Sequence, residues 1–98
     1  MEAVPKFKGD LKKYLKDSLH YPEREKEAGI TGTVYLSFIV KEDGTLDSIK
    51  LFKGVPNGPG LDMEAIRLVE RMPKWSPAMQ NGHPISLKIY HAIDFNLR

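Results

Sequence analysis

The stretch TVYLSFIVK, residues 33–41, decides the fold, because apolar and polar side chains alternate along it. One face carries Val34, Leu36, Phe38 and Val40. A period of two that is rich in β-branched and aromatic residues predicts a strand buried on one side. The chain therefore contains a sheet with one face turned to a hydrophobic core.

A hairpin follows this strand. Residues 42–45, EDGT, predict a tight turn in which Gly44 adopts a positive φ angle. Residues 46–53 return as a second strand, in which Ile49 and Leu51 are expected to face the core. Residues 54–60, GVPNGPG, predict a loop, because glycine and proline both interrupt regular structure.

An amphipathic helix over residues 11–19 precedes the hairpin. Its apolar residues recur at helical spacing and leave the lysines opposite; they are Leu11, Tyr14, Leu15 and Leu19. Asp10 is the expected N-cap, because its carboxylate can accept a hydrogen bond from a free amide at the helix start. Pro22 ends the pattern, and residues 23–28 predict one further short turn of helix.

A second helix follows the loop. Asp62 is expected to cap it, and it should run from Met63 to about Met72 before Pro73 ends it. Its expected apolar side consists of Ala65, Ile66, Val69 and Met72. The extended segment after it carries the only tryptophan, Trp75. Anchoring that segment against the core is favoured for this indole over a role as a binding hot spot.

The last element is a long third strand over residues 85–97, after a turn at Asn81–Gly82. Its expected inward residues are Ile85, Leu87, Ile89, His91, Ile93, Phe95 and Leu97. Its expected outward residues are Ser86, Lys88, Tyr90, Ala92, Asp94 and Asn96.

The element order α-β-β-α-β limits the topology. The hairpin makes the first two strands antiparallel neighbours, and a right-handed crossover brings the third strand to the free side of the first. We therefore predict an α+β fold, a two-layer sandwich whose three-stranded antiparallel sheet has the order 2-1-3, with two helices on one face. The third strand then lies at an edge.

Composition bounds the class of protein. The chain has 98 residues, enough for one domain, and its 15 basic and 13 acidic residues are interleaved. A mixed-charge surface is favoured over a nucleic-acid footprint. There is no cysteine. The longest apolar run is far shorter than the roughly 20 residues that span a membrane, and no signal peptide follows Met1. The chain is thus expected to be cytoplasmic or a piece excised from a longer protein.

Residues that carry chemistry are scattered. The three histidines lie in three different elements, without metal-ligand spacing; they are His20, His83 and His91. A satisfied core or edge histidine is the favoured interpretation of His91. The acidic side chains Glu23, Glu25 and Glu27 are expected to be solvated, unlike tuned catalytic carboxylates. The glycine-rich loop lacks the ending of a phosphate loop. We predict no enzyme activity and no cofactor or metal.

Five motifs in order resemble the TonB C-terminal domain family, from about Val4 to the C-terminus. They are YP at 21–22 with AGITGTV at 28–34, DG at 43–44, LDMEAIRLV at 61–69, MPKWSPA at 72–78, and NGHPI at 81–85 with IDF at 93–95. The third and fourth are most similar to TonB-like proteins of Bacteroidetes. Many relatives carry Leu-Pro late in the last strand, where this chain has His91 and Ala92.

The resemblance implies a TonB-like C-terminal domain over residues 1–98, with a membrane helix and a proline-rich span upstream. It implies a periplasmic domain of an energy transducer anchored to the inner membrane. Its partners would be the TonB box of outer-membrane transporters and, through the missing N-terminal region, a motor of the ExbB and ExbD type.

An open edge strand can accept an extended peptide as a further strand. The expected contacts on the third strand are Ser86, Lys88, Tyr90, Ala92 and Asp94. The resemblance adds His20, Tyr21 and Pro22, because the family's Tyr-Pro segment lies near the bound box. Ending the first helix and packing on the sheet is an equally weighted role for these three residues. The long third strand also makes a homodimer possible.

Two other functions compete with transport. A TonB-like domain can be fused to a membrane sensor or peptidase, or serve as an envelope scaffold. An RNA-binding α+β domain has a similar order of elements, and outward Tyr35 and Tyr90 could stack on bases. The basic and aromatic signature of such RNA-binding domains is missing from the chain, which disfavours this second alternative.

Overall fold

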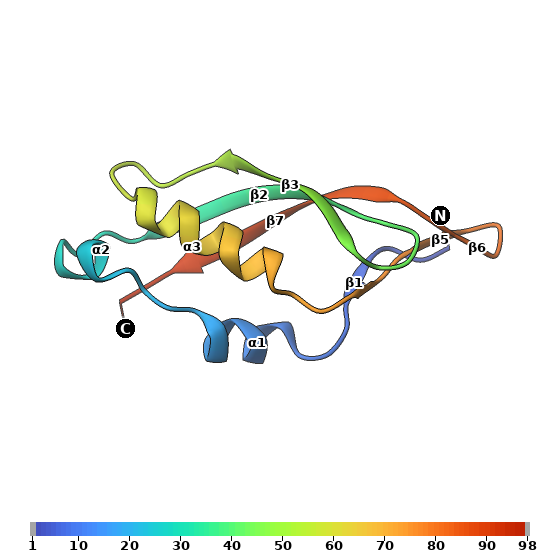
Figure 1. Ribbon diagram of the computed structural model, residues 1–98, viewed down its shortest axis with the longest axis horizontal. Helices are drawn as coiled ribbons and strands as arrows, with labels where there is room; N and C mark the ends of the chain where they lie inside the picture. Colours follow the sequence, from blue (N-terminus) through green and yellow to red (C-terminus); the bar gives the residue numbers. More distant parts are fainter. Residues whose placement is uncertain (1, 98) are drawn as a thin grey trace.

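The computed structural model describes residues 2–97 and has an elongated body of 50 × 24 × 17 Å (Figure 1). The larger elements follow the expected order, and several short strands are added to them. In chain order the elements are β1 (Lys6–Phe7), α1 (Leu11–Ser18), α2 (Glu23–Glu27), β2 (Gly32–Val40), β3 (Leu46–Lys53), α3 (Pro59–Glu70), β4 (Trp75–Ser76), β5 (Ala78–Gln80), β6 (His83–Ile85) and β7 (Leu87–Phe95).

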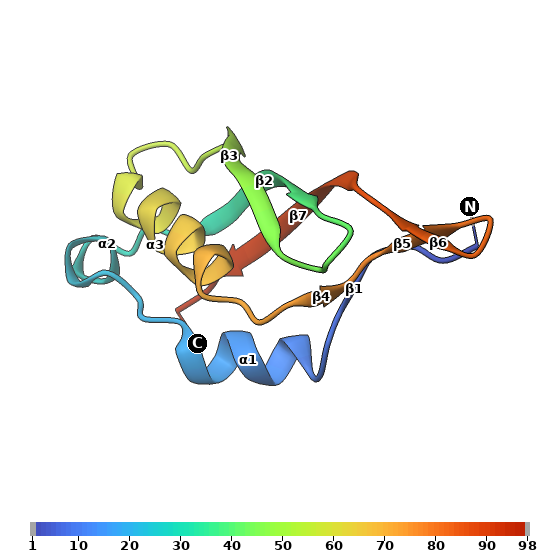
Figure 2. The same ribbon diagram turned by 45° about the vertical axis from the view of Figure 1, so that its right-hand side comes forward.

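The main sheet is antiparallel and has the order β3-β2-β7. This corresponds to the order 2-1-3 expected for the three long strands. Helix α3 packs across β3 and β2, and α1 lies beside α3, where the Tyr14 hydroxyl donates to the Leu68 carbonyl at 2.7 Å. Figures 1 and 2 show both helices on the same side of the sheet. The predicted two-layer α+β fold is confirmed.

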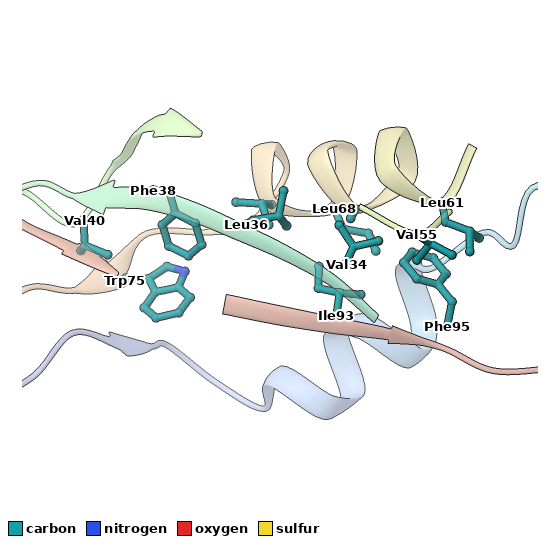
Figure 3. Close-up of a cluster of buried hydrophobic side chains, with 12 residues drawn as sticks. Val34, Leu36, Phe38, Val40, Val55, Leu61, Leu68, Trp75, Ile93 and Phe95 are labelled. Atoms are coloured by element: carbon teal, nitrogen blue, oxygen red, sulfur yellow. The ribbon is translucent and has the colours of Figure 1, made fainter. Parts of the chain in front are cut away.

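The core lies between the helices and the inner face of β2. The four alternating residues Val34, Leu36, Phe38 and Val40 are fully buried, as their spacing predicts (Figure 3). The Trp75 ring packs against Phe38 with ring centroids 5.4 Å apart. Because Trp75 is only 5% exposed, its predicted role as a core anchor is confirmed.

The hairpin turn at Gly44 docks on the tryptophan segment. Gly44 has a φ of 86°, and its carbonyl accepts the Trp75 amide at 2.8 Å. A Cβ at position 44 would overlap the Trp75 carbonyl oxygen. The turn that connects two strands therefore also positions the segment that closes the core.

Helix α3 begins earlier than predicted. It starts at Pro59, with Gly58 as its N-cap, so the expected start at Met63 was wrong. Proline suits the first helical position because its fixed φ is helical and it has no amide to leave unpaired. Asp62 is not the cap: its carboxylate accepts the Val55 amide at 3.0 Å. The buried side of the helix is formed by Leu61, Glu64, Ala65, Leu68 and Val69, whereas Ile66 and Met72 are half-buried.

Glu25 was wrongly expected to be solvated. Its side chain is 2% exposed. Its carboxylate accepts hydrogen bonds from the Gly60 amide at 2.6 Å and from the Arg24 guanidinium at 3.2 Å. Gly60 lies in the first turn of α3, where free amides and the helix dipole favour a negative group. The carboxylate thus joins α2 to the start of α3.

The predicted third strand is broken in two. Residues 83–85 form β6, which pairs with β5 around the Asn81–Gly82 turn, and the strand resumes as β7 after Ser86. The β5–β6 hairpin forms an arm that extends away from the main sheet (Figure 2). Ser86 therefore lies outside the strand on which it was expected.

Leu51, which was expected to face the core, is poorly buried. It is opposite Leu36 in the register but is 43% exposed, whereas Ile49 on the same strand is half-buried. Phe52 is an extra residue between the pairs formed by Leu51 and Lys53. A second irregularity surrounds Ser48, whose φ is 51°.

Candidate partner-binding edge

The two edges of the main sheet differ in regularity. The register between β3 and β2 shifts twice, once at Phe52 and once near Ser48. Bulges of this kind twist an edge and disrupt its hydrogen-bonding groups, which is how natural sheets discourage pairing with another chain. The β3 edge is therefore a poor template for a further strand.

The β7 edge is the regular one. Nine consecutive pairs join β7 to β2, from Leu87 with Val40 to Phe95 with Gly32, without any shift. Within residues 2–97, β2 is the only strand that pairs with β7. Alternate residues of an antiparallel strand direct their amide and carbonyl groups away from the paired neighbour. The edge is thus a regular row of donors and acceptors.

The outer face of β7 carries the predicted contact residues Lys88, Tyr90, Ala92 and Asp94, all of which are exposed. Tyr90 is 62% exposed, and the Lys88 ammonium lies 5.8 Å from its ring centroid. Asp94 accepts the Thr33 hydroxyl at 2.6 Å. These four residues share one face beside the edge, as the alternation predicts.

Tyr21 lies on the opposite, helix-covered side of the sheet. Its hydroxyl donates to the Ile30 carbonyl, and its ring packs edge-on against Phe95 with centroids 5.8 Å apart. A hollow of about 500 Å³ lies beside it, lined also by Lys26, Asn96 and Leu97. Tyr21 therefore borders the C-terminal end of β7, separate from the outer-face residues.

His20 and Pro22 border a second groove, of about 670 Å³, between the α1–α2 connection and α3. The His20 amide donates to the Glu64 carboxylate at 2.7 Å. Arg67 donates to both oxygens of the same carboxylate at 2.7 Å and to the Ser18 carbonyl at 2.8 Å. This network ends α1 and holds the connection on α3. The sequence did not indicate this groove, because its walls come from distant segments.

Charge holds this network together. Burial raises the pKa of Glu64, but hydrogen bonds from Arg67 and the His20 amide outweigh it and leave the pKa below its ordinary 4.5. Because the folded state then binds its proton less tightly than the unfolded state, the stabilisation is complete above about pH 4.5 and is lost as pH falls through the lower folded-state pKa.

Glu64→Gln should lower the free energy of unfolding at pH 7 by about 1.5–3 kcal/mol, the size of a hydrogen bond to a charged group. Urea unfolding of both proteins from pH 7 to pH 3 measures it. The difference between the proteins should shrink below pH 4.5. A constant difference across this range would show that the carboxylate charge contributes nothing.

His91 was predicted to be a satisfied histidine, and this is wrong in detail. His91 Nε2 and Trp75 Nε1 are buried without a hydrogen-bond partner among the described residues. Burial lowers the pKa of His91 below its ordinary 6.5. The ring faces Trp75 and Phe38 edge-on at 6.2 and 6.3 Å. His91 is therefore a half-buried residue on the inner face of β7, where burial disfavours its charged form.

Other chemistry is limited within residues 2–97. No three acidic or histidine side chains there are placed to hold a metal ion. No helix among the described residues is both long and apolar enough to cross a membrane. The architecture is that of a small α+β domain that presents one regular sheet edge, beside a groove on its helix side.

Residues 17–97 match the family described as the Gram-negative bacterial TonB protein C-terminal, and the chain belongs to this family. The family consists of periplasmic, non-enzymatic domains of TonB-type energy transducers, which interact with outer-membrane transporters. No curated protein sequence matches the chain significantly.

Two solved structures share the fold. The solution structure of the Pseudomonas aeruginosa TonB C-terminal domain has a TM-score of 0.63 and 23% identity, covering 80% of this chain and 77% of that one. The solution structure of the Helicobacter pylori TonB C-terminal domain has a TM-score of 0.62 and 21% identity, covering 89% of this chain and 77% of that one.

Proposed function

We propose that this domain captures the TonB box of outer-membrane transporters by adding it as a fourth strand to the free edge of β7. The observation that carries the proposal is the contrast between the edges: nine uninterrupted pairs on β7 against two register shifts on β3. Strand addition needs a regular row of unpaired backbone groups, and β7 has one.

Backbone pairing alone makes this capture weak. About five hydrogen bonds, each worth roughly 0.5–1.5 kcal/mol, oppose an association cost of at least about 4 kcal/mol. Side-chain contacts must supply the remainder, and we assign them to both faces of the edge. On the outer face these contacts come from Lys88, Tyr90, Ala92 and Asp94. On the helix side they come from Tyr21. Because His20 and Pro22 border the neighbouring groove, they contribute by holding Tyr21 in place.

In the full protein the domain would be anchored to the inner membrane and driven by a motor of the ExbB and ExbD type. A segment laid along β7 resists a pull parallel to the strand, because its hydrogen bonds are loaded together in shear. Modest affinity then lets the partner go when the pull ends. The same edge can pair with a second copy of the chain, so a homodimer through β7 would compete with the peptide.

Two N-methylated versions of one TonB-box peptide provide the test. One carries methyl groups on its odd-numbered amides and the other on its even-numbered amides. Because an added strand pairs through one edge, only one set of amides faces β7. Losing two bonds costs about 1–3 kcal/mol, so one version should bind about tenfold or more weakly, while the other should bind like the unmodified peptide.

Binding is measured by NMR titration of the labelled domain. Shifts should concentrate on β7 and Tyr21, and β3 serves as the internal control. Equal binding by both methylated peptides would contradict strand addition, since it would show that the amides do not pair. Shifts confined to the β3 edge would contradict the choice of β7.

A further inference from the structure

The outer face of the sheet carries an exposed aromatic pair beside the β7 edge. Phe52 is 67% exposed and Tyr90 is 62% exposed, and their ring centroids lie 5.2 Å apart in an edge-on arrangement. Ser37 lies between them on β2, paired with Tyr90, and is only 4% exposed. The two rings therefore meet across the central strand and cover it, although this face has no helix layer.

Phe52 comes from the irregular edge of the sheet. It is the extra residue between the pairs Leu36–Leu51 and Tyr35–Lys53. Because Leu51 is paired with the inward Leu36, alternation turns Phe52 to the outer face. The Phe52 ring, on the irregular β3 edge, therefore contacts the Tyr90 ring on the regular β7 edge.

Charges of both signs lie near the ring pair. Lys88 lies over the Tyr90 ring at 5.8 Å, and Lys50 on β3 is opposite Ser37 of β2. Two carboxylates accept hydrogen bonds from neutral groups: Asp94 from the Thr33 hydroxyl at 2.6 Å, and Asp47 from the Ser48 amide at 2.7 Å. Lys88 stands on the edge strand beside Tyr90 and forms no ion pair among the described residues, so a carboxylate on an added strand would complement it.

We propose that Tyr90 and Lys88 read the sequence of the captured segment: it carries an apolar side chain beside Tyr90 and a carboxylate, two residues away, beside Lys88. The proposal rests on the proposed function, because the segment must first pair with β7. Directly opposite residues in paired strands have Cβ atoms about 4.5–5.5 Å apart and share a face. Residues beside Tyr90 and Lys88 are then two positions apart in the partner.

This arrangement explains how the edge can be selective. Backbone hydrogen bonds are the same for any extended segment, so they cannot distinguish one partner from another. The inner face of β7 offers mainly apolar residues that are already packed in the core. The outer face offers a ring and a cation side by side, and an apolar and an acidic side chain complement this pair.

A displayed library of random ten-residue peptides tests the inference with the folded domain as bait. The unmodified domain should enrich peptides with an acidic residue two positions from an apolar one. Lys88→Glu should enrich a basic residue in place of the acid, and should bind the original peptides several-fold to about tenfold more weakly. Tyr90→Ser should lose the apolar preference and weaken binding by a similar factor.

Lys50→Glu is the matched control, because it makes the same charge change on the same face. Position 50 lies across β2 from β7, two strand spacings of about 4.8 Å away, so selection should stay unchanged. Lys88→Gln, which removes the charge without reversing it, should abolish the acidic preference. Circular dichroism verifies that each variant is folded.

The outcomes separate the two proposals. Enrichment of the same acidic and apolar pattern by the Lys88 and Tyr90 variants would overturn the inference and leave strand capture intact. Capture of no peptide by the unmodified domain would overturn strand capture, and the inference with it.

Discussion

Replacing Trp75 with alanine should destabilise the domain by about 3–5 kcal/mol, the cost of removing a large buried aromatic side chain. The indole is 5% exposed and packs against Phe38, Phe7 and His91 with ring centroids 5.4, 6.0 and 6.2 Å away. A domain of this size has a total stability of about 5–15 kcal/mol. The substitution would therefore remove a large part of it.

Urea unfolding followed by far-UV circular dichroism measures this loss, because the variant lacks the only tryptophan and cannot be followed by tryptophan fluorescence. Met63→Ala is the control: Met63 is 71% exposed on α3, and its loss should change stability by no more than about 0.5 kcal/mol. A loss below about 1 kcal/mol for Trp75→Ala would mean that the indole is not the anchor of the core.

Gly44→Ala should cost at least about 3 kcal/mol, for two separate reasons. The φ of 86° is unfavourable for any side chain, which costs about 1–2 kcal/mol. The added Cβ would also overlap the Trp75 carbonyl oxygen. Moving that carbonyl would disturb the hydrogen bond that the Trp75 amide donates to the Gly44 carbonyl and would shift the indole. The cost of the backbone conformation and the cost of lost packing therefore add.

Gly82→Ala separates the two reasons. Gly82 has a φ of 76°, but nothing lies within 4 Å of a Cβ built there. This variant should lose only the backbone contribution of about 1–2 kcal/mol. Thermal unfolding of the two variants, side by side, gives the comparison. Equal losses would show that the contact between the hairpin turn and the tryptophan segment adds nothing to stability.

The substitutions Trp75→Ala and Gly44→Ala should also affect the proposed capture of a partner. The β7 edge keeps its shape because β7 pairs with β2 on one side and its inward residues Ile93 and Phe95 are buried in the core. Weakening the core near Trp75 loosens the support of this strand. Peptide affinity should therefore fall in the Trp75 and Gly44 variants before they unfold globally, and it should remain unchanged in Gly82→Ala.

Local chemistry was sufficient to predict the long elements. Alternation over residues 33–41 predicted β2, and Asp10 was correctly assigned as the cap of α1, where it accepts the Lys13 amide at 3.1 Å. The hairpin at Gly44 and the outward side of β7 were predicted in the same way. Each of these features depends on neighbours within a few positions, so the chain order of the residues contains the information.

Features made by distant residues were missed. Glu25 is buried because α3 begins beside it, 35 positions along the chain. The break at Ser86 accompanies the pairing of β6 with β5, and the alternation along β3 does not reveal that Leu51 is exposed. The contact of Phe52 with Tyr90 joins residues on the two outer strands, whose positions along the chain do not show that their rings meet across β2.

Periodicity, turn residues and ordered motifs are all read along the chain, so the two-layer α+β fold and its family could be predicted from the residues alone. Which sheet edge is regular, and what surrounds it, became visible in the folded chain. Edge regularity depends on the pairing of three strands, and the surfaces near Tyr21 and Tyr90 are assembled from segments far apart in sequence. Such arrangements exist only in the folded chain, since Tyr21 meets Phe95 and Tyr90 meets Phe52 across long stretches of sequence.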